Sequence, residues 1–470
     1  MKLTPIIHPL VQDFLKHPDI VFQAKLLHNG PVHVIFPQIM DQTITRLKEV
    51  FSTQRIDAAI YYAHKPNKSI AFAKQALKNG IGIDVASRQE LISALAAGFV
   101  GAQISCTGAK NREFLYLAVQ HGCLISLDSQ SELKEAALLA ETLRKDVRVL
   151  IRIANPTSKD RNLKGKRSRF GVPKEELPEM YATLKTSRLK LCGFHYHNDE
   201  RAADVKAGYT EDLMTIMEQA YAEGFSPTII NIGGGLRSPQ LAHFEEWSAF
   251  LDKLEYALLT HKPTGTWRNY GFGMVINEKQ KISGREKIQG KYTNQDFTEV
   301  LTELLENTSL RGRKLADIIG ESMFTVMVEP GFALLQHCGI SLSSVVGVKH
   351  ASDGENYMLL DSNIYNHSSQ MNELLTDPIL FSRKQSGAPF SGYAMGNLCR
   401  EEDIILKRKV SLSTTPQPGD VLCFINTAAY SSDFEDAQPH QHPTGKKFVA
   451  VQQDGSWQLL SEDVYNPFIH

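Results

Sequence analysis

Short apolar runs alternate with stretches of helical periodicity from about residue 55 onward. The runs are AAIYYA, IGIDVA, AQISCT, CLISLD, VRVLIRIA, LKLCGFHYH and TIINIGGG. Each is apolar almost throughout, which is typical of a parallel strand covered on both faces. Between them lie segments such as ASRQELISALAAGF and SQSELKEAALLAETL, with Ser87 and Ser131 at expected N-cap positions. The pattern predicts a (β/α)₈ barrel, in which chemistry gathers at the carboxyl ends of the strands.

This alternation breaks near residues 256–322, where the chain is rich in Gly, Lys and Asn and poor in periodic apolar residues. We interpret this stretch as an insertion that forms an arm or lid. Beyond it, runs such as SLSSVVGVKH, NYMLLDS and GDVLCFIN are separated by turns and predict antiparallel strands. We therefore predict a barrel over 46–335 with the insertion near 256–322, and a β-domain formed by 1–45 and 336–470.

The composition limits the classes of partner that the chain can be expected to bind. Hydrophobic residues make up 42% of the chain and charged residues 22%, and the formal net charge is -1. This balance offers no basic field for nucleic acid or an anionic membrane. Polar residues interrupt every apolar run of the N-terminal segment MKLTPIIHPLVQDFLKHPDI, so neither a signal peptide nor a spanning helix is expected, and we expect a cytoplasmic protein. Small molecules and other copies of the chain are the expected partners.

Six scattered cysteines without a CxxC pair argue against a disulfide framework and against a structural zinc site. Two histidines, His195 and His197, share one side of a predicted strand because side chains alternate with period two. One imidazole could lie flat against a cofactor ring. The pair could also bind a metal, but no further ligand stands at a matching interval, so no metal is predicted.

Lys65 is a candidate for covalent chemistry. It follows the run AAIYYAH and precedes Pro66, which places it at the carboxyl end of a predicted strand. A lysine that is partly withdrawn from water there can be nucleophilic enough to form a Schiff base. Taken alone, the segment is more typical of a loop that carries a solvated lysine.

Two further strand ends carry candidate groups. Gly233 opens a glycine triplet after TIINI, where the backbone can approach a phosphate, although such triplets also form tight turns. Glu329 follows the run TVMV and precedes Pro330 and Gly331. A carboxylate at a barrel mouth could stabilise a protonated pyridine nitrogen, and the alternative is a strand-end cap.

Ten motifs occur together in a characteristic order: YYAHKPNKS, IDVASRQEL, ISCTGAK, LIRI, RFG, GFHYH, INIGGG, EPG, GNLCREED and GDVLCFINTAAY. Over about residues 40 to 450 the chain resembles the fold type III pyridoxal-phosphate decarboxylases, such as diaminopimelate and ornithine decarboxylases. The resemblance implies an alanine-racemase-like (β/α)₈ barrel with a C-terminal antiparallel β-domain. It also implies pyridoxal 5'-phosphate as cofactor, a small amino-acid substrate, and a homodimer with shared active sites.

The resemblance assigns roles motif by motif. It implies that Lys65 bonds covalently to the cofactor, that His197 stacks on its ring and that Glu329 contacts the pyridine nitrogen. Cys399 of GNLCREED is implied to protonate the substrate carbon from the partner subunit. The further positions implied to bind or orient the cofactor or its lysine are Asp84, Glu90, Arg152, Gly233, Gly234, Gly235, Gly331 and Tyr430.

The chain departs from the family pattern at positions that bear on the substrate. Arg400 stands where the family usually has an acid that reads a distal amine. A guanidinium there would repel an amine and favour a carboxylate through bidentate hydrogen bonds. Alternatively, Arg400 turns outward and Glu401 contacts the substrate. Phe332 replaces a usual arginine after EPG, and a usual serine is replaced around Asp199 and Glu200.

Similar departures occur in a family branch that decarboxylates an amino acid joined to citrate during carboxylate siderophore assembly. We therefore expect a substrate with an anionic tail, such as N-citrylornithine, bound near Arg400, Glu401 and Tyr430. Decarboxylation of free diaminopimelate, ornithine or lysine is the alternative. The insertion would suit a bulkier substrate, although it is also compatible with surface decoration.

Two other functions compete with decarboxylation. In a racemase of this barrel class an arginine faces the pyridine nitrogen, and Glu329 argues against that function. An inactive regulatory homologue is the alternative from another class. Such proteins usually lose the lysine or the cysteine acid, whereas Lys65 and Cys399 are both present.

Overall fold

The computed structural model describes residues 2–154, 168–198, 202–309, 311–352, 354–367, 373–384, 387–434 and 438–469. By its internal contacts the chain divides into two compact units. The barrel unit comprises Met40–Leu236 and Phe297–Leu334, and the sheet unit comprises Met1–Ile39, Arg237–Asp296 and Leu335–His470. The stretch predicted as one insertion is thus divided, with residues 256–296 in the sheet unit and 297–322 in the barrel unit.

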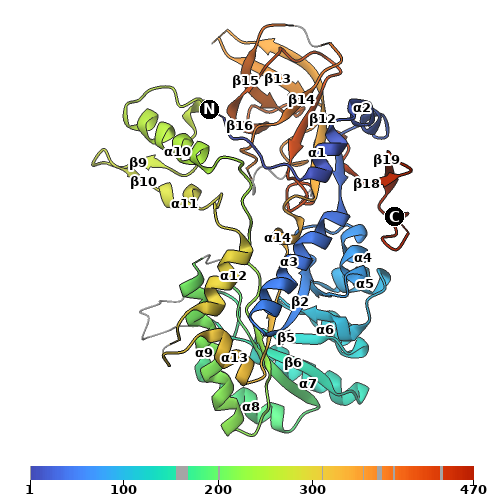
Figure 1. Cartoon of the computed structure of the whole chain (residues 1–470), viewed down its shortest axis with the longest axis vertical. Coiled ribbons are helices and arrows are strands. Elements are labelled where there is room, and N and C mark those ends of the chain that lie inside the picture. The colour runs from blue at the N-terminus through green and yellow to red at the C-terminus, as the bar shows by residue number, and fades with distance from the viewer. Residues whose placement is uncertain are drawn as a thin grey trace. The chain divides into compact units, whose positions relative to one another are not determined.

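Eight parallel strands close the barrel in the order β11-β2-β3-β4-β5-β6-β7-β8 (Figure 1). They are β2 (Asp57–Ala63), β3 (Gly82–Val85), β4 (Ile104–Cys106), β5 (Leu124–Leu127), β6 (Val147–Arg152), β7 (Leu189–His195), β8 (Ile229–Asn231) and β11 (Thr325–Val328). Almost every residue of β3, β5 and β11 is buried, because helices cover the outside and side chains fill the inside. The predicted (β/α)₈ barrel is confirmed.

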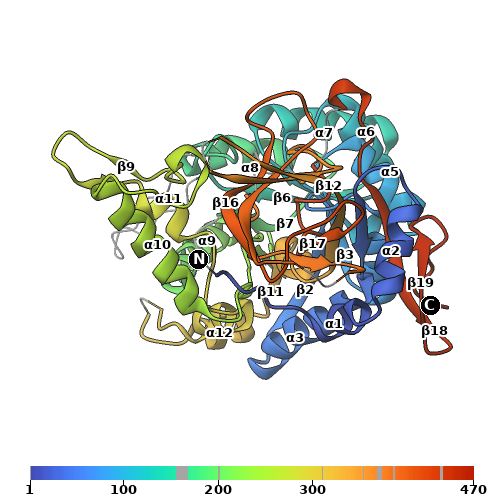
Figure 2. The same cartoon turned by 90° about the horizontal axis from the view of Figure 1, so that it is seen from above.

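Helices of the barrel unit lie outside these strands, as Figure 2 shows for α5, α6 and α7. They are α3 (Met40–Thr53), α4 (Ile70–Lys78), α5 (Arg88–Ala96), α6 (Arg112–His121), α7 (Gln130–Leu143), α8 (Leu177–Lys185), α9 (Ala203–Ala222), α12 (Phe297–Glu306), α13 (Leu315–Glu321) and α14 (Phe332–Leu335). Inside the barrel, Leu124, Leu150 and Met327 pack into an apolar cluster. The interior is therefore a packed core, which leaves the strand ends for chemistry.

Of the two predicted serine N-caps, one is confirmed and the other is wrong. Ser87 caps α5, because its hydroxyl accepts the Glu90 N–H at 3.1 Å, as predicted. The prediction for Ser131 is wrong, because Ser129 is the N-cap of α7 and its hydroxyl accepts the Glu132 N–H at 3.2 Å. An N-cap side chain accepts the N–H two or three positions on, and Ser131 already lies inside the first turn of α7.

The sheet unit is built on a nine-stranded sheet. Its strands are β1 (Val32–Ile35), β12 (Gly339–His350), β13 (Asn356–Leu360), β14 (Ile379–Phe381), β15 (Phe390–Met395), β16 (Ile404–Leu412), β17 (Val421–Ile425), β18 (Lys446–Gln453) and β19 (Ser456–Ser461). Most pairs are antiparallel, which confirms the predicted β-domain, but β1 with β18 and β13 with β15 are parallel. Two N-terminal helices, α1 (Pro9–Leu15) and α2 (Pro18–Leu26), belong to the same unit.

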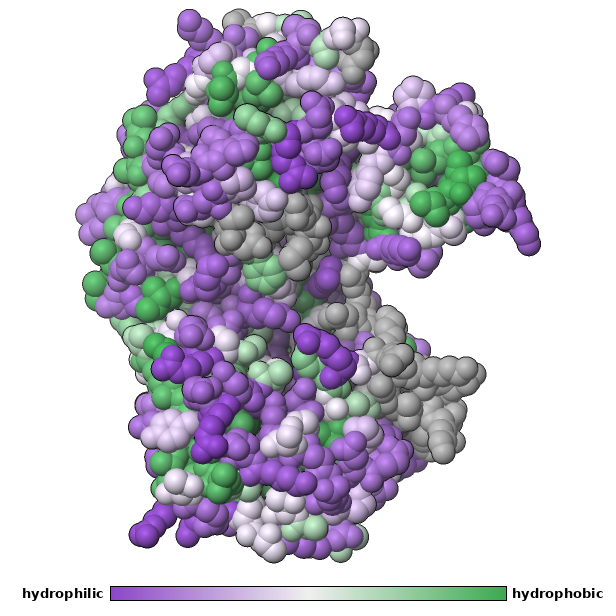
Figure 3. Space-filling model, turned by 180° about the vertical axis from the view of Figure 1, so that it is seen from behind, coloured by the Kyte–Doolittle hydropathy of each residue, from purple (hydrophilic) through white to green (hydrophobic). Residues whose placement is uncertain are grey.

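An arm within the sheet unit consists of α10 (Phe244–Leu259), the hairpin β9 (Val275–Ile276) and β10 (Ile282–Ser283), and α11 (Arg285–Gln289). Its core holds Trp247 stacked on Phe250 with ring centroids 5.5 Å apart, together with Leu3 and Leu375 from elsewhere in the unit. Hydrophobic residues also gather on the surface of the arm (Figure 3). Among the described helices, none is long and apolar enough to cross a membrane.

The corrected cap of α7 gives a stability prediction. Ser129→Ala should lower the free energy of unfolding by about 1 kcal/mol, because it leaves the Glu132 N–H without its acceptor. Ser131→Ala, two residues away in the same turn, is the matched control and should change stability by less than about 0.5 kcal/mol. Urea denaturation of both variants tests the assignment, and a larger loss for Ser131→Ala would contradict it.

Candidate active site

The barrel unit places one set of predicted residues at the carboxyl ends of its strands. Lys65 follows β2, Asp84 lies in β3 and Arg152 ends β6, while His197 and Glu329 follow β7 and β11. This end of a (β/α)₈ barrel is where active sites lie. Strand topology alone therefore brings side chains from five different strands to one face.

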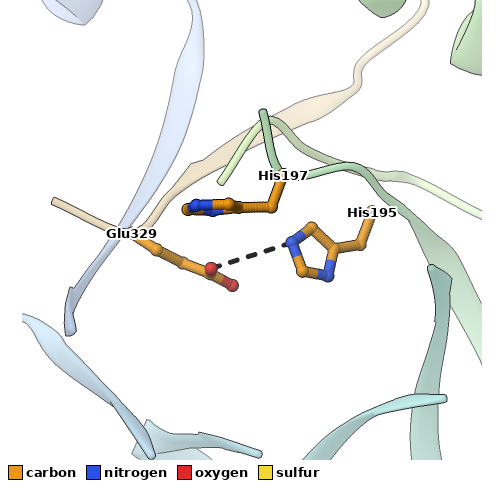
Figure 4. Close-up of side chains that lie close together, drawn as sticks. All are labelled: His195, His197 and Glu329. Carbon is orange, nitrogen blue, oxygen red and sulfur yellow. Dashed lines mark ion pairs between the residues drawn. The ribbon is translucent and has the colours of Figure 1, made fainter. Parts of the chain in front are cut away.

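Glu329 is buried, and two side chains lie next to its carboxylate. The side-chain amide of Asn231 donates to Oε1 at 2.6 Å, and Nε2 of His195 lies 3.7 Å from Oε2 (Figure 4). Burial raises the pKa of Glu329, while the Asn231 hydrogen bond and the charges of His197, Arg152 and Lys65 act in the opposite direction. The site therefore contains a carboxylate that burial penalises and that gains from a cationic partner.

The two histidines of the HYH motif have different environments. His195 is buried, and its Nδ1 shares a hydrogen bond with the Ser126 hydroxyl at 2.8 Å. Burial, together with the charge of Arg152, lowers the pKa of His195 well below its ordinary value, so this imidazole is neutral at neutral pH. His197 is half-buried, and its ring lies above the Glu329 carboxylate in Figure 4. An imidazole in that place can cover one face of a planar ring.

The glycine triplet forms a turn that only glycine fits. Gly233 has φ +66° and Gly235 has φ +80°, which favour residues without a Cβ. A Cβ at Gly234 would lie 2.7 Å from the Glu329 carbonyl oxygen. The Gly234 N–H donates to Nδ1 of His197 at 3.2 Å, so the turn also orients the ring.

Two residues that sequence reasoning missed hold this turn in place. Asn231 accepts the Gly233 N–H at 2.8 Å with the side chain that donates to Glu329. Lys206 of α9 is buried and donates to the Gly234 carbonyl at 3.2 Å. Asn231 could have been found from the sequence, because it is the polar residue inside the run IINIGGG. Lys206 gives no such signal.

Asp84 and Arg152 flank the same end of the barrel. Asp84 is buried and accepts a hydrogen bond from the Thr107 hydroxyl at 3.0 Å. Burial, and then the charge of Glu329, raise the pKa of Asp84 well above its ordinary value. The Arg152 guanidinium lies 3.7 Å from the Asp128 carboxylate and 4.6 Å from the Phe170 ring centroid. Asp128 was also missed by the sequence analysis.

Lys65 is exposed, so the structure does not show the withdrawal from water expected from the sequence. Its charge nevertheless lowers the pKa of Glu329, which places the ammonium within electrostatic reach of that carboxylate. Gly331 is needed next to this loop, because a Cβ there would lie 2.7 Å from Pro66. Glu90 accepts the Ala86 N–H at 2.7 Å and so contributes to the start of α5.

The sheet unit carries the other predicted residues, Cys399, Arg400, Glu401 and Tyr430. All six cysteines lie in the described ranges: Cys399 is exposed, Cys192 is half-buried, and Cys106, Cys123, Cys338 and Cys423 are buried. Cys399 is thus the thiol most open to solvent. Asp199 and Glu200 fall outside the described residues, and Phe332 begins α14.

Asp403 fixes the backbone of the loop that carries Cys399. Its carboxylate accepts the Leu398 N–H at 2.7 Å and the Ile364 N–H at 2.8 Å. A Cβ at Gly396 would lie 2.0 Å from this carboxylate, so glycine is required there. The loop is therefore tied to a buried acid that the sequence analysis did not single out.

Arg400 and Glu401 lie next to different side chains. Arg400 is exposed, and it donates to the Tyr365 hydroxyl at 3.4 Å and lies 3.6 Å from Glu402. Glu401 lies 3.6 Å from the Arg268 guanidinium. Tyr430 has φ +66°, an uncommon value for a residue with a bulky side chain that usually marks a constrained functional position.

A metal could also use part of the barrel site. His195, His197 and Glu329 offer ligand atoms that all lie within 4.8 Å of one another. Two imidazoles and a carboxylate are a ligand set that zinc accepts. The expectation of no metal therefore stays a prediction.

The donor set fits pyridoxal 5'-phosphate. It contains an amine for the aldehyde in Lys65, a buried carboxylate for the pyridine nitrogen in Glu329 and a ring to cover one face in His197. The Gly233–Gly235 turn lies at the same end, where the N–H groups of Gly233 and Gly234 donate to Asn231 and His197. The aldehyde and the pyridine ring of the cofactor thus have chemically matched groups at one end of the barrel.

Comparison with known proteins decides the family. Residues 40–260 match the model of the pyridoxal-dependent decarboxylases, pyridoxal binding domain. Residues 40–260 are thus the pyridoxal binding domain of a pyridoxal-dependent decarboxylase. It is a carboxy-lyase that uses pyridoxal 5'-phosphate to decarboxylate an amino acid.

Relatives of this pyridoxal-phosphate decarboxylase cover most of its length. The uncharacterized protein y4yA of Sinorhizobium fredii is 26% identical over 96% of this chain and 94% of its own. The L-glutamyl-(BtrI acyl-carrier protein) decarboxylase of Niallia circulans is 26% identical over 85% of this chain and 84% of its own. The structure of Helicobacter pylori diaminopimelate decarboxylase complexed with L-lysine aligns with a TM-score of 0.67 at 17% identity, covering 94% of this chain and 95% of that one.

The buried acids give a pH prediction for the cofactor-free protein. The pKa values of Asp84 and Glu329 are raised on folding, so the stability they contribute is fully present below the ordinary values of 3.8 and 4.5 and is lost as pH rises through the raised values. Asp84→Asn should therefore increase the free energy of unfolding at pH 7 by about 1 kcal/mol or more, with little gain at pH 4.

Urea denaturation of the cofactor-free protein between pH 4 and pH 8 measures this difference. Asp146→Asn, which changes an exposed carboxylate of the same unit, is the matched control and should follow the parent curve. An Asp84→Asn variant that is destabilised equally at every pH would show that the carboxylate is not strained by burial.

Proposed function

We propose that this decarboxylase acts on an amino acid with an anionic tail, of the type of N-citrylornithine in carboxylate siderophore assembly. The observation that carries the proposal is Arg400, an exposed guanidinium one residue after the exposed Cys399 thiol. A guanidinium binds carboxylates bidentately and repels a free ammonium. We propose a cytoplasmic setting for this reaction.

The ion pair of the neighbouring acid, Glu401, supports the same assignment. Glu401 is the alternative reader, and it lies 3.6 Å from Arg268. An ammonium that approached Glu401 would compete with this cation. The carrier-bound L-glutamyl group in the name of the Niallia circulans relative also fits a family in which the amino acid is attached to a larger group.

Residues of the barrel unit would hold the cofactor. We assign the covalent link to Lys65, the pyridine nitrogen to Glu329, the ring face to His197 and the phosphate to Gly233–Gly235. When bound, the cofactor supplies an electron-poor ring that accepts the electron pair released as CO₂ leaves. Glu329 would hold the proton on the pyridine nitrogen, which keeps the ring electron-poor.

Cys399 is assigned as the acid that protonates the substrate carbon after CO₂ departs. It is exposed on a loop that Asp403 fixes, so the thiol is accessible while its backbone is held. We propose that this loop serves the barrel of a second copy in a homodimer. The barrel and the thiol would then come from different chains at each active site.

Decarboxylation of a free diamino acid is the second candidate. The fold of the Helicobacter pylori diaminopimelate decarboxylase, complexed with L-lysine, matches nearly the whole chain. This candidate requires an acid at the distal amine, and Glu401 is the nearest one in sequence. The match to the pyridoxal-dependent decarboxylases favours this activity over a racemase and over an inactive homologue.

Lys65→Ala should reduce CO₂ release by about 100-fold or more and remove the visible absorbance of bound cofactor, because the amine that bonds to the aldehyde is lost. The test is CO₂ release from cofactor-loaded protein together with its absorbance spectrum. Lys68→Ala, an exposed lysine three residues on, is the matched control and should keep both. Normal turnover by Lys65→Ala would refute the assignment.

Arg400→Glu should shift preference from N-citrylornithine to free ornithine by about 10- to 100-fold in the ratio of kcat/KM values, because the site then repels carboxylates and attracts an ammonium. Glu401→Gln should change this ratio less than about fivefold, since an exposed ion pair contributes at most about 1 kcal/mol. CO₂ release with both compounds measures the ratio. A larger effect of Glu401→Gln would favour the free diamino acid.

A further inference from the structure

The sheet unit contains a pocket of about 530 Å³ between the start of the arm and the sheet. The residues that define it are Trp267, Arg268, Tyr357, Tyr393, Glu401 and Lys409. Its volume falls in the range of small-molecule sites. Glu401 of the motif GNLCREED stands at its edge, and none of the residues assigned to the cofactor lines it.

Backbone pairing fixes the wall that the arm contributes. Thr266 pairs with Arg408 of β16 in an antiparallel bridge, and the Lys409 N–H donates to the Gly265 carbonyl at 3.0 Å. Arg408 is buried and donates to the Leu375 carbonyl at 2.6 Å. The segment is therefore an added edge of the sheet, which distinguishes it from surface decoration.

Three aromatic rings line the pocket. The Trp267 ring lies edge-to-face with Tyr393 at 5.4 Å and with Tyr357 at 5.9 Å between centroids. Trp267 is half-buried, so part of its surface remains open to a ligand. Such rings offer flat apolar surface for methylene and amide groups.

The charged side chains at the pocket are already paired. Arg268 lies 3.6 Å from Glu401, and Lys409 lies 2.6 Å from Glu355. A free ammonium or carboxylate would have to break one of these pairs. A neutral amide or hydroxyl group can instead hydrogen-bond to the paired groups without displacing either member. The pocket therefore suits a polar, uncharged segment of a ligand.

The pocket begins beside the loop proposed to face the substrate. Glu401 is two residues after Cys399, so their Cα atoms lie within about 7 Å of each other. Arg400 stands between them. A molecule whose reacting carbon meets Cys399 could therefore extend past Arg400 into the pocket.

We propose that this pocket binds the amide-linked acyl part of the substrate, with Trp267 as its principal contact. The inference rests on the proposed function and adds the class of group that the enzyme recognises: an acyl chain joined to the amino acid through an amide. Carboxylates of that chain meet Arg400, and its amide, hydroxyl and methylene groups lie against the aromatic rings. A free diamino acid would leave the pocket unfilled.

The test compares holoenzymes of the parent, Trp267→Ala, Trp267→Phe and Tyr256→Ala. Tyr256 is an exposed aromatic residue of the arm outside the pocket and serves as the matched control. Trp267→Ala should raise KM for N-citrylornithine about tenfold with little change in kcat, since one aromatic contact is worth on the order of 1 kcal/mol. Trp267→Phe should recover most of the loss, and Tyr256→Ala should match the parent.

A second measurement separates this inference from the proposed function. Calorimetry with N-citrylputrescine, which lacks the α-carboxylate that decarboxylation removes, reports binding without turnover. If the parent releases CO₂ from free ornithine alone yet binds N-citrylputrescine in a Trp267-dependent way, the proposed substrate is wrong and the pocket inference holds. If N-citrylornithine is turned over but neither its KM nor calorimetric binding responds to Trp267→Ala, the pocket inference is overturned.

Discussion

The buried carboxylate of Glu329 is the constraint on which the rest of the barrel site depends. A carboxylate in this position is costly unless partners surround it, and the Asn231 amide and the nearby cations provide that compensation. The same Asn231 holds the glycine turn, and the turn orients His197. The site is therefore one connected network, in which Asn231 joins the buried acid to the loop beside it.

The two compact units divide the chemistry between them. The barrel unit supplies the groups that match the cofactor, and the sheet unit supplies an exposed thiol, a guanidinium and an aromatic pocket. The cofactor contacts can then stay the same between related enzymes, while the loop after β15 and the segment of the arm after α10 differ in sequence. Arg400 stands in that loop and Trp267 in the arm, whereas the partners of Glu329 stand in the barrel unit.

The sequence was sufficient to locate those residues whose place in the fold follows from their position at the end of a strand. Lys65, Glu329 and the glycine turn were found because strand ends of a (β/α)₈ barrel converge. It failed where a partner is set by tertiary structure: Ser126 meets His195, and Lys206 meets Gly234, across distances in sequence that no local pattern encodes. For the same reason, the arm was read as part of one barrel insertion, although its core packs with Leu3 and Leu375 of the sheet unit.

The parallel pairing of β1 with β18 places Val32 beside Lys446, more than 400 residues later in the chain. At about 5–20 residues per second, ribosomal synthesis leaves β1 without this neighbour for about 20 to 80 seconds. The barrel strands lie between these two segments in the sequence and can pair with one another during that time. Biogenesis of this protein thus has an inherent order, in which the cofactor-binding unit is completed first and the sheet closes last, with an unpaired strand edge that chaperones would have to protect.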